Sequence, residues 1–101
     1  MKIYPEVKIT NMYSYKGTMN RVANQFIVSL PDDGEYFQSY KTIIAYKSSP
    51  YGQIYLDEKQ WDCSVSTGRY RNQYLGEGIA ETRKKIADGT YKLENLNEKK
   101  D

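Results

Sequence analysis

An α+β fold is predicted for this 101-residue chain: an antiparallel β-meander of about four or five strands, followed by two short helices packed on one face. β-Branched and aromatic residues alternate with polar ones through the first 56 residues. Helical spacing and cap residues appear only after Trp61. Strands followed by helices are typical of an α+β domain. The length allows one domain, which we place at 1–97, with 98–101 as a disordered tail.

The first two strands are predicted from period-two alternation. Residues 2–10 alternate as a strand, and Pro5 favours an edge position because proline cannot donate to a β-ladder. Residues 22–30 form the second predicted strand, with Phe26 and Val28 on its core face.

Turn signals delimit the next strands. The sequence Pro-Asp-Asp-Gly at 31–34 predicts a tight turn, since proline fixes φ and glycine accepts a positive φ. We expect one strand over 35–46 after this turn. A second turn at 48–52 leads to a short strand at 53–56.

Two helices are predicted in the second half of the chain. Ser66 is expected to cap the first helix, with Val65 packed on Tyr70 and Gly76 as a left-handed stop. The second helix is predicted at 78–88. A last extended segment docks through three apolar residues, Tyr91, Leu93 and Leu96.

The predicted core is thin in aliphatic residues. Val, Ile, Leu and Phe make up only 19 of the 101 residues, so eleven tyrosines and one tryptophan supply much of the buried area. Trp61, the largest apolar side chain, is expected to anchor the sheet to a helix. The predicted core residues are Phe26, Val28, Ile44, Trp61, Tyr70, Leu75, Ile79 and Ile86.

Composition argues against several classes of protein. The chain has no histidine, which removes Ser-His-Asp and Cys-His catalysis and the imidazole ligand of zinc. Its single cysteine cannot form an internal disulfide. We therefore expect no enzyme, no cofactor and no metal. No stretch approaches the ~20 apolar residues of a membrane span, and the start has no apolar run of signal-peptide length, so we expect a cytoplasmic protein with no membrane contact.

The segment Cys63–Arg69 has the form of a cysteine, five residues and an arginine. It resembles the phosphate-binding loop of Cys-dependent protein tyrosine phosphatases, in which backbone N–H groups cradle phosphate and the arginine clamps it. Asp62 stands where that family has histidine, and this carboxylate disfavours the thiolate. Tyr70 follows the arginine where a small hydroxyl residue is expected. We favour a helix cap with a half-buried cysteine, and leave open whether the loop binds an anion.

Several short motifs are spread over roughly residues 22–96. They are Asn24-Gln25-Phe26, Phe37-Gln38-Ser39-Tyr40, Tyr55-Leu56-Asp57, Trp61-Asp62-x-Ser64, Thr67-x-x-Tyr70 and Tyr74-Leu75-Gly76. Together they resemble a small domain family of unknown function from bacteriophages and other mobile elements of Firmicutes and gut bacteria. An aromatic residue often stands at the position of Cys63 in that family, which weakens a catalytic role for the thiol. The resemblance implies an origin and no activity.

The first functional hypothesis is a non-enzymatic, phage-type accessory protein that binds a host protein in the bacterial cytoplasm. Inhibition of host defence, as by anti-CRISPR proteins, is the specific role considered. Tyrosine suits such a surface because it gives a large, rigid contact area at small entropic cost. A homodimer through the edge strand is also permitted. The candidate partner-binding residues are Tyr13, Tyr15, Lys16, Tyr36, Tyr46, Tyr51, Arg69 and Arg71.

The alternative hypothesis is a protein that binds single-stranded nucleic acid. Basic residues are interleaved with aromatic ones around Tyr15, Tyr46 and Tyr70, a combination used for base stacking and phosphate contact. A net charge of +2 is modest for this task. Positive and negative segments alternate along the chain, which indicates a mixed, solvated surface.

Overall fold

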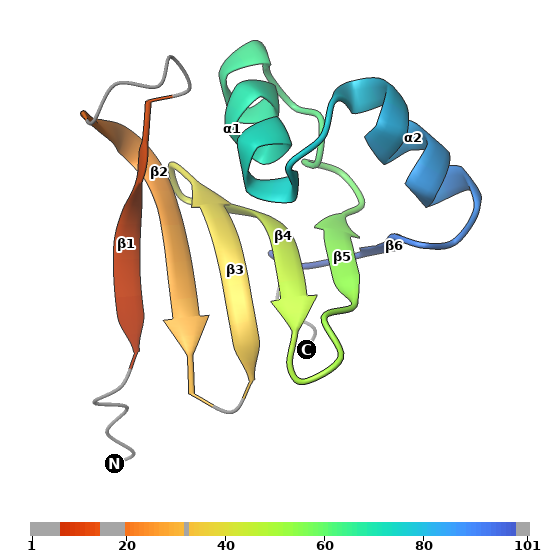
Figure 1. The fold of residues 1–101 in the computed structure, drawn as a ribbon, viewed down its shortest axis with the longest axis horizontal. Coiled ribbons are helices and arrows are strands. Elements are labelled where there is room, and N and C mark those ends of the chain that lie inside the picture. The colour runs from red at the N-terminus through yellow and green to blue at the C-terminus, as the bar shows by residue number, and fades with distance from the viewer. Residues whose placement is uncertain (1–6, 15–19, 32, 99–101) are drawn as a thin grey trace.

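The computed structural model describes residues 7–14, 20–31 and 33–98. These residues form one sheet of six strands, with both helices gathered at one end of it (Figure 1). The elements are β1 (Lys8–Tyr13), β2 (Arg21–Leu30), β3 (Gly34–Ser39), β4 (Thr42–Ser48), β5 (Ile54–Asp57), α1 (Val65–Leu75), α2 (Ile79–Ala87) and β6 (Lys92–Glu94). The predicted α+β class is confirmed, and the sheet has one strand more than the four or five expected.

The strands lie in the sheet in the order in which they occur in the chain. β1 to β5 pair antiparallel, and β1 is an edge strand. β6 pairs parallel with β5, through Tyr55↔Lys92 and Leu56↔Leu93. A parallel neighbour needs a crossover connection, and the two helices between β5 and β6 provide it. The predicted extended segment at the end of the chain thus becomes the sixth strand.

The prediction of one strand over 35–46 is wrong, because this segment folds into a hairpin. β3 ends at Ser39, which pairs with Thr42 across a two-residue turn at Tyr40 and Lys41. Tyr40 has a φ of 57°, and its backbone N–H donates to the carbonyl of Asn24 at 2.6 Å. The positive φ is carried by a residue with no turn preference, so the sequence gives no signal for it.

The N-cap of α1 also lies two residues earlier than predicted. Ser64, and not Ser66, is the N-cap, and its hydroxyl accepts from the backbone N–H of Thr67 at 3.1 Å. Val65 is 75% exposed and begins the helix, so it does not pack on Tyr70 as expected. Gly76 ends α1 with a φ of 71°, as predicted.

The core lies between the sheet and α1. Phe37 stacks on Tyr74 of α1 with ring centroids 5.5 Å apart, and the hydroxyls of Ser39 and Thr67 lie 2.9 Å apart. Odd-numbered residues of β3 therefore face α1, because side chains alternate along a strand. The buried cluster consists of Met12, Phe37, Ile44, Ala45, Leu56, Tyr70 and Tyr91.

The predicted core residues divide into four groups. Ile44 and Tyr70 are buried in the cluster, as predicted. Three further residues are half-buried and lie at the edge of the core, packed against the cluster: Trp61, Leu75 and Ile86. Phe26 and Val28 are corrections: both lie on the opposite face of the sheet, because Ile27 is the β2 residue that pairs with Phe37. Ile79 is half-buried and lines a cleft beside α1.

Two buried carboxylates, those of Glu77 and Asp57, accept hydrogen bonds that hold the C-terminal third of the chain to the rest of the domain. Glu77 accepts hydrogen bonds from Lys85, Thr82 and Tyr91 at 2.6, 2.8 and 2.8 Å, which joins the end of α1 to α2 and the segment after it. Burial opposes ionisation of Glu77, but these three donors hold its pKa below the usual value. Asp57 accepts from the backbone N–H groups of Lys59, Gln60 and Leu96.

Hydrogen bonds and an ion pair hold the last described residues, as far as Glu98, to the rest of the domain. Glu98 pairs with Lys59 at 2.9 Å, and its backbone N–H donates to Asn95. The side chain of Asn97 pairs with both the backbone N–H and the carbonyl of Ile43, at 2.7 and 2.8 Å. Residues 99–101 lie outside the described part.

Candidate interaction surface

The sheet face opposite α1 carries a continuous apolar surface. Even-numbered residues of β3 face away from the helix, and the strand register extends this face to both sides of Tyr36. We call this surface the tyrosine face. It consists of Ile9, Phe26, Val28, Tyr36, Gln38, Ile43, Tyr46 and Tyr55.

Three tyrosines from neighbouring strands stack on one another at the centre of this face. The rings of Tyr36 and Tyr46 are 4.5 Å apart between centroids, and those of Tyr46 and Tyr55 are 5.8 Å apart, both at interplanar angles of 25°. The hydroxyl of Tyr46 donates to Asp33, whose carboxylate and carbonyl oxygens lie 2.6 and 2.8 Å away. This hydrogen bond, together with burial, raises the pKa of Tyr46 to about 12. The hydrogen bond to Asp33 therefore orients the central ring of the stack, and Tyr46 keeps its proton well above neutral pH.

Aliphatic side chains continue the surface toward β1. Val28 lies beside Tyr36, and Ile9, which is 67% exposed, lies beside Val28 on the edge strand. Ile9, Phe26, Val28 and Gln38 surround a shallow cavity of about 260 Å³. An exposed isoleucine next to a half-buried aromatic row makes a patch that a partner could cover.

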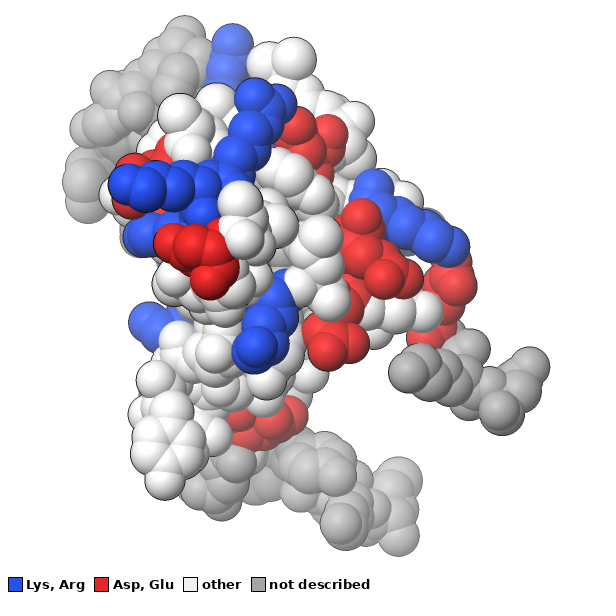
Figure 2. Space-filling model, turned by 90° about the vertical axis from the view of Figure 1, so that its right-hand side faces the viewer, with Lys and Arg blue, Asp and Glu red and all other residues white. Residues whose placement is uncertain are grey.

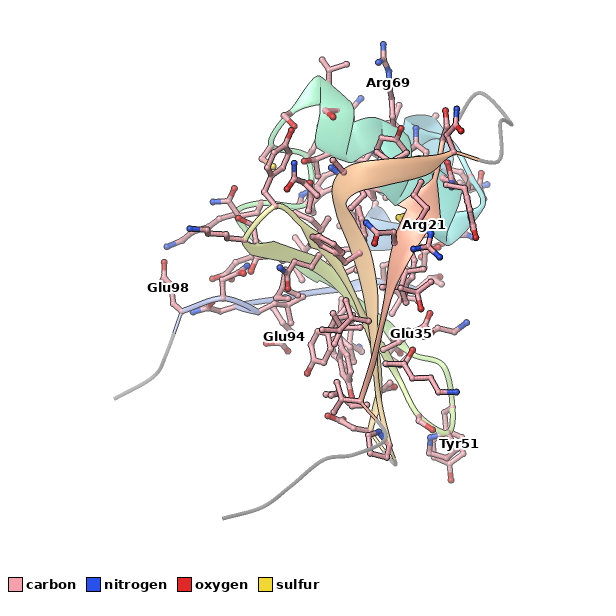
Figure 3. All side chains as sticks on the ribbon, turned by 90° about the vertical axis from the view of Figure 1, so that its left-hand side faces the viewer. Arg21, Glu35, Tyr51, Arg69, Glu94 and Glu98 are labelled. Atoms are coloured by element: carbon pink, nitrogen blue, oxygen red, sulfur yellow. The ribbon has the colours of Figure 1, made fainter. Side chains whose placement is uncertain are left out.

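The eight candidate partner-binding residues do not converge on this face. Tyr36 and Tyr46 lie on it. Tyr13 ends β1, where its carbonyl accepts from Gln73 of α1 at 2.9 Å, so it lies on the helix side. Tyr51 is 93% exposed in the β4–β5 turn and projects at the end of the sheet away from α1 (Figure 3). Tyr15 and Lys16 lie outside the described residues.

The two candidate arginines have different environments. Arg69 is exposed and extends from α1 away from the sheet (Figure 3). Arg71 is only 2% exposed, which corrects its prediction as a surface contact. Its guanidinium donates to the carbonyl of Trp61 at 2.8 Å and to Asp62 at 3.1 Å, and lies 5.3 Å from the centre of the Trp61 ring. Arg71 therefore links the loop at residues 61–62 to α1 by hydrogen bonds.

The segment Cys63–Arg69 does not form a phosphatase loop. α1 begins at Val65, so only Ser64 separates the exposed cysteine from the helix. The backbone N–H groups of Thr67 and Gly68 are bound to Ser64, through its hydroxyl and its carbonyl, and do not converge on one point in a loop. The preferred interpretation of a helix cap fits this geometry, with the cap at Ser64. The expectation of a half-buried cysteine is wrong, because Cys63 is exposed.

Several residues of the tyrosine face were not selected from the sequence. Ile9, Phe26, Val28 and Tyr55 belong to it, although two of them were predicted as core. The alternation of β2 could have grouped Phe26 with Val28, because it shows which residues of one strand share a face; placing Ile9 and Tyr55 beside them requires the strand register. Alternation does not show which of the two faces the helices cover.

The side of the molecule that contains α2 is of mixed charge. Figure 2 shows acidic and basic side chains interspersed on the side that contains α2, as expected from the sequence. Among the residues that the structure describes, no cluster of three or more metal-binding side chains occurs. No helix in these ranges has the length and apolar character needed to cross a bilayer.

The comparison with protein families agrees with this architecture. A model described as a family of unknown function, DUF8033, matches residues 7–89, from the start of β1 through α2. No curated protein and no solved structure matches the chain. The predicted membership in a family of unknown function is confirmed, since the match covers most of the sequence. The chain belongs to the DUF8033 family.

Proposed function

We propose that this protein is a non-enzymatic binding protein that presents its tyrosine face to a protein partner. The observation that carries the proposal is the stack of Tyr36, Tyr46 and Tyr55, flanked by the exposed Ile9 and by Val28. Aromatic side chains in a rigid, weakly charged patch are typical of the centre of a protein interface. α1 packs on the other face of the sheet, so neither helix of the described residues covers this one.

The arrangement of the rings supports a protein partner over single-stranded nucleic acid. Proteins that bind bases by stacking offer aromatic ring faces beside a positive groove. Here the faces of Tyr36, Tyr46 and Tyr55 cover one another. A line of paired residues crosses the sheet through Tyr46, and Lys92 of β6 is the one cation in it among the described residues. The Tyr46 hydroxyl is bound to a carboxylate, that of Asp33.

The finer proposal concerns the partner. We infer a bacterial host protein as the partner and a phage-type accessory factor acting in the cytoplasm, with host-defence inhibition of the anti-CRISPR kind as its role. The small size, the surface tyrosines and the resemblance described above support this. The free edge of β1 also allows a homodimer by strand pairing.

The test is an affinity capture from a bacterial host lysate, with and without nuclease, using two matched tyrosine variants. Tyr36→Ser removes the first ring of the stack, whereas Tyr51→Ser removes a fully exposed tyrosine away from it. We expect a partner whose capture is unaffected by nuclease and which the Tyr51→Ser variant still binds. Tyr36→Ser should weaken its binding at least about tenfold, as expected for an interface hot spot.

Folding is controlled separately. Ile9→Lys changes an exposed side chain of the same face, so it places a charge in the interface with little effect on the core. This variant should also weaken binding of the partner, while its thermal unfolding midpoint stays close to that of the wild type. Equal binding by Tyr36→Ser, Ile9→Lys and Tyr51→Ser would contradict the proposal. Nuclease-sensitive capture would favour the nucleic-acid alternative.

A further inference from the structure

The two outer strands of the sheet differ in how well they are protected against pairing with another strand. β6 has only three residues, and two of them, Lys92 and Glu94, are charged and exposed. A short, charged edge is a common device that prevents unwanted strand pairing. β1, the outer strand on the other side (Figure 1), has six residues, of which Lys8 alone is charged. Of the two edges, β1 is therefore the one suited to receive another strand.

The outer side of β1 is a row of backbone groups that no other strand of the described residues satisfies. β2 is the one strand in this part of the chain that pairs with β1, and the backbone N–H and C=O groups of an antiparallel strand alternate between its two sides. The side chains along this edge are also uncovered: Lys8, Ile9 and Thr10 are exposed, and Ile9 is 67% exposed. A neighbouring strand therefore satisfies backbone groups and covers an isoleucine at the same time.

The sequence of β1 is compatible with antiparallel pairing to itself. With the symmetry axis at Thr10, Thr10 lies opposite Thr10 of a second copy, Ile9 opposite Asn11, and Lys8 opposite Met12. The residues of each opposed pair then share a face of the sheet, as the alternation of an antiparallel pair requires. The two Lys8 residues lie at opposite ends of the seam, about 14 Å apart along the strands. No charge therefore faces a like charge directly, which is the arrangement that destabilises strand pairs.

We propose that two copies of this chain pair antiparallel through β1, with Thr10 opposite Thr10 of the second copy. The six-stranded sheet of one copy then continues into that of the other. The twofold axis is perpendicular to the sheet, so both tyrosine faces lie on the same side of it. The inference does not rest on the proposed function, because the seam is made by the backbone of β1 and not by the tyrosine stack.

Ile9 favours a second copy over an extended segment of another protein. It lies on the tyrosine face, beside Val28. In the proposed register the Ile9 residues of the two copies are diagonal neighbours on this face, at about 7–8 Å across the seam. The second copy thus always brings an apolar side chain to the exposed Ile9, whereas a foreign strand does so only if its own sequence matches. The pairing also joins the two tyrosine faces into one apolar surface.

The experiment measures self-association of the purified full chain by sedimentation velocity. Concentrations run from roughly 5 to 500 µM, since an interface of one strand pair is small. We expect a reversible equilibrium between monomer and dimer in this range. Thr10→Lys places two ammonium groups directly opposite one another, so it should weaken the dimer at least about tenfold at low ionic strength. Thr10 is exposed and pairs with Ile27 on the helix side of the sheet, so this change leaves the tyrosine face as it is.

A mixture of opposite charges tests the register. Thr10→Glu alone should weaken the dimer as Thr10→Lys does, but an equimolar mixture of the two variants places a carboxylate opposite an ammonium group and should restore dimerisation to the level of the wild type. Tyr51→Lys adds the same charge at a 93% exposed residue outside β1, so it is the control and should dimerise like the wild type.

Three results would overturn the proposal. The first is a wild-type protein that remains monomeric at about 500 µM. The second is a dimer that Thr10→Lys weakens no more than Tyr51→Lys does. The third is a mixture of the two Thr10 variants that associates no better than either variant alone. The purified chain is measured without a host partner, so each of these results leaves the proposal for the tyrosine face unaffected.

Discussion

The hydroxyls of Ser39 and Thr67 lie 2.9 Å apart and join the last residue of β3 to the first turn of α1. Both side chains are at most 3% exposed, so neither hydroxyl has water as an alternative partner. Ser64 caps the same turn through the N–H of Thr67. A short polar seam, and not apolar packing alone, therefore sets where α1 meets the sheet. Residues quoted for the family resemblance, among them Ser39, Ser64 and Thr67, meet in this seam.

The first prediction concerns this seam. Thr67→Val should lower the free energy of unfolding by about 1–3 kcal/mol, because it leaves the Ser39 hydroxyl buried without a partner. The double variant Ser39→Ala with Thr67→Val should cost less than the sum of the two single changes, since no polar group is then stranded. Urea denaturation of the four proteins measures the coupling. Strict additivity would contradict the inferred hydrogen bond.

Arg71 is predicted to be essential for stability. Arg71→Gln removes the donors to Trp61 and Asp62 from a buried site, and we expect a loss of about 2–4 kcal/mol in the free energy of unfolding. Arg83→Gln, at a residue with a side chain 66% exposed, should cost less than about 0.5 kcal/mol. Chemical denaturation compares the two. A surface role for Arg71 would make their effects equal.

The turn between β2 and β3 depends on a glycine. Gly34 has a φ of 132°, and a Cβ at this position would lie on the carbonyl oxygen of Lys47. We expect Gly34→Ala to destabilise the protein by roughly 3 kcal/mol or more. Gly68→Ala is the control: Gly68 is helical, and its Cβ would be 3.6 Å from the nearest atom of Arg71, so the change should be neutral or stabilising. Thermal unfolding of both variants checks the difference.

The stability of the protein should fall at alkaline pH. The hydrogen bond from Tyr46 to Asp33 raises the pKa of this tyrosine from 10.0 to about 12. Between these values the unfolded chain has lost the phenolic proton that the folded chain keeps, so unfolding releases a proton and becomes easier as the pH rises. The contribution of Tyr46 to the free energy of unfolding is fully present below pH 10 and is lost as the pH rises through about 12.

Phenolate absorbance and urea denaturation across this range measure the effect. Tyr46→Phe lacks the titrating group, so its stability should decline less steeply between pH 10 and 12. Burial and the hydrogen bond to Glu35 also raise the pKa of Tyr74 above its usual value, so part of the alkaline decline should remain in this variant. An identical pH profile for the variant and the wild type would show that Tyr46 does not keep its proton in the folded state.

Parts of the fold follow from local chemistry and were predictable. The turn before β3 contains proline, aspartate and glycine, and Gly76 has the left-handed conformation that ends a helix. The hairpin at Tyr40 was not predictable, because a tyrosine at positive φ is held by the bond of its N–H to Asn24. The parallel pairing of β6 likewise depends on contacts between two segments that both helices separate in the chain.

The sequence by itself determined the strand-then-helix order, the main turns and the residues that share each face of a strand. Only the tertiary structure decided which face the helices cover. In β2 the alternation places Gln25 and Ile27 on one side and Phe26 and Val28 on the other, and the apolar pair appears the better core. α1 is instead anchored by Phe37 and Ser39, which pair with Ile27 and Gln25. Periodicity fixes the grouping of side chains, but the choice between two faces depends on contacts between segments distant in sequence.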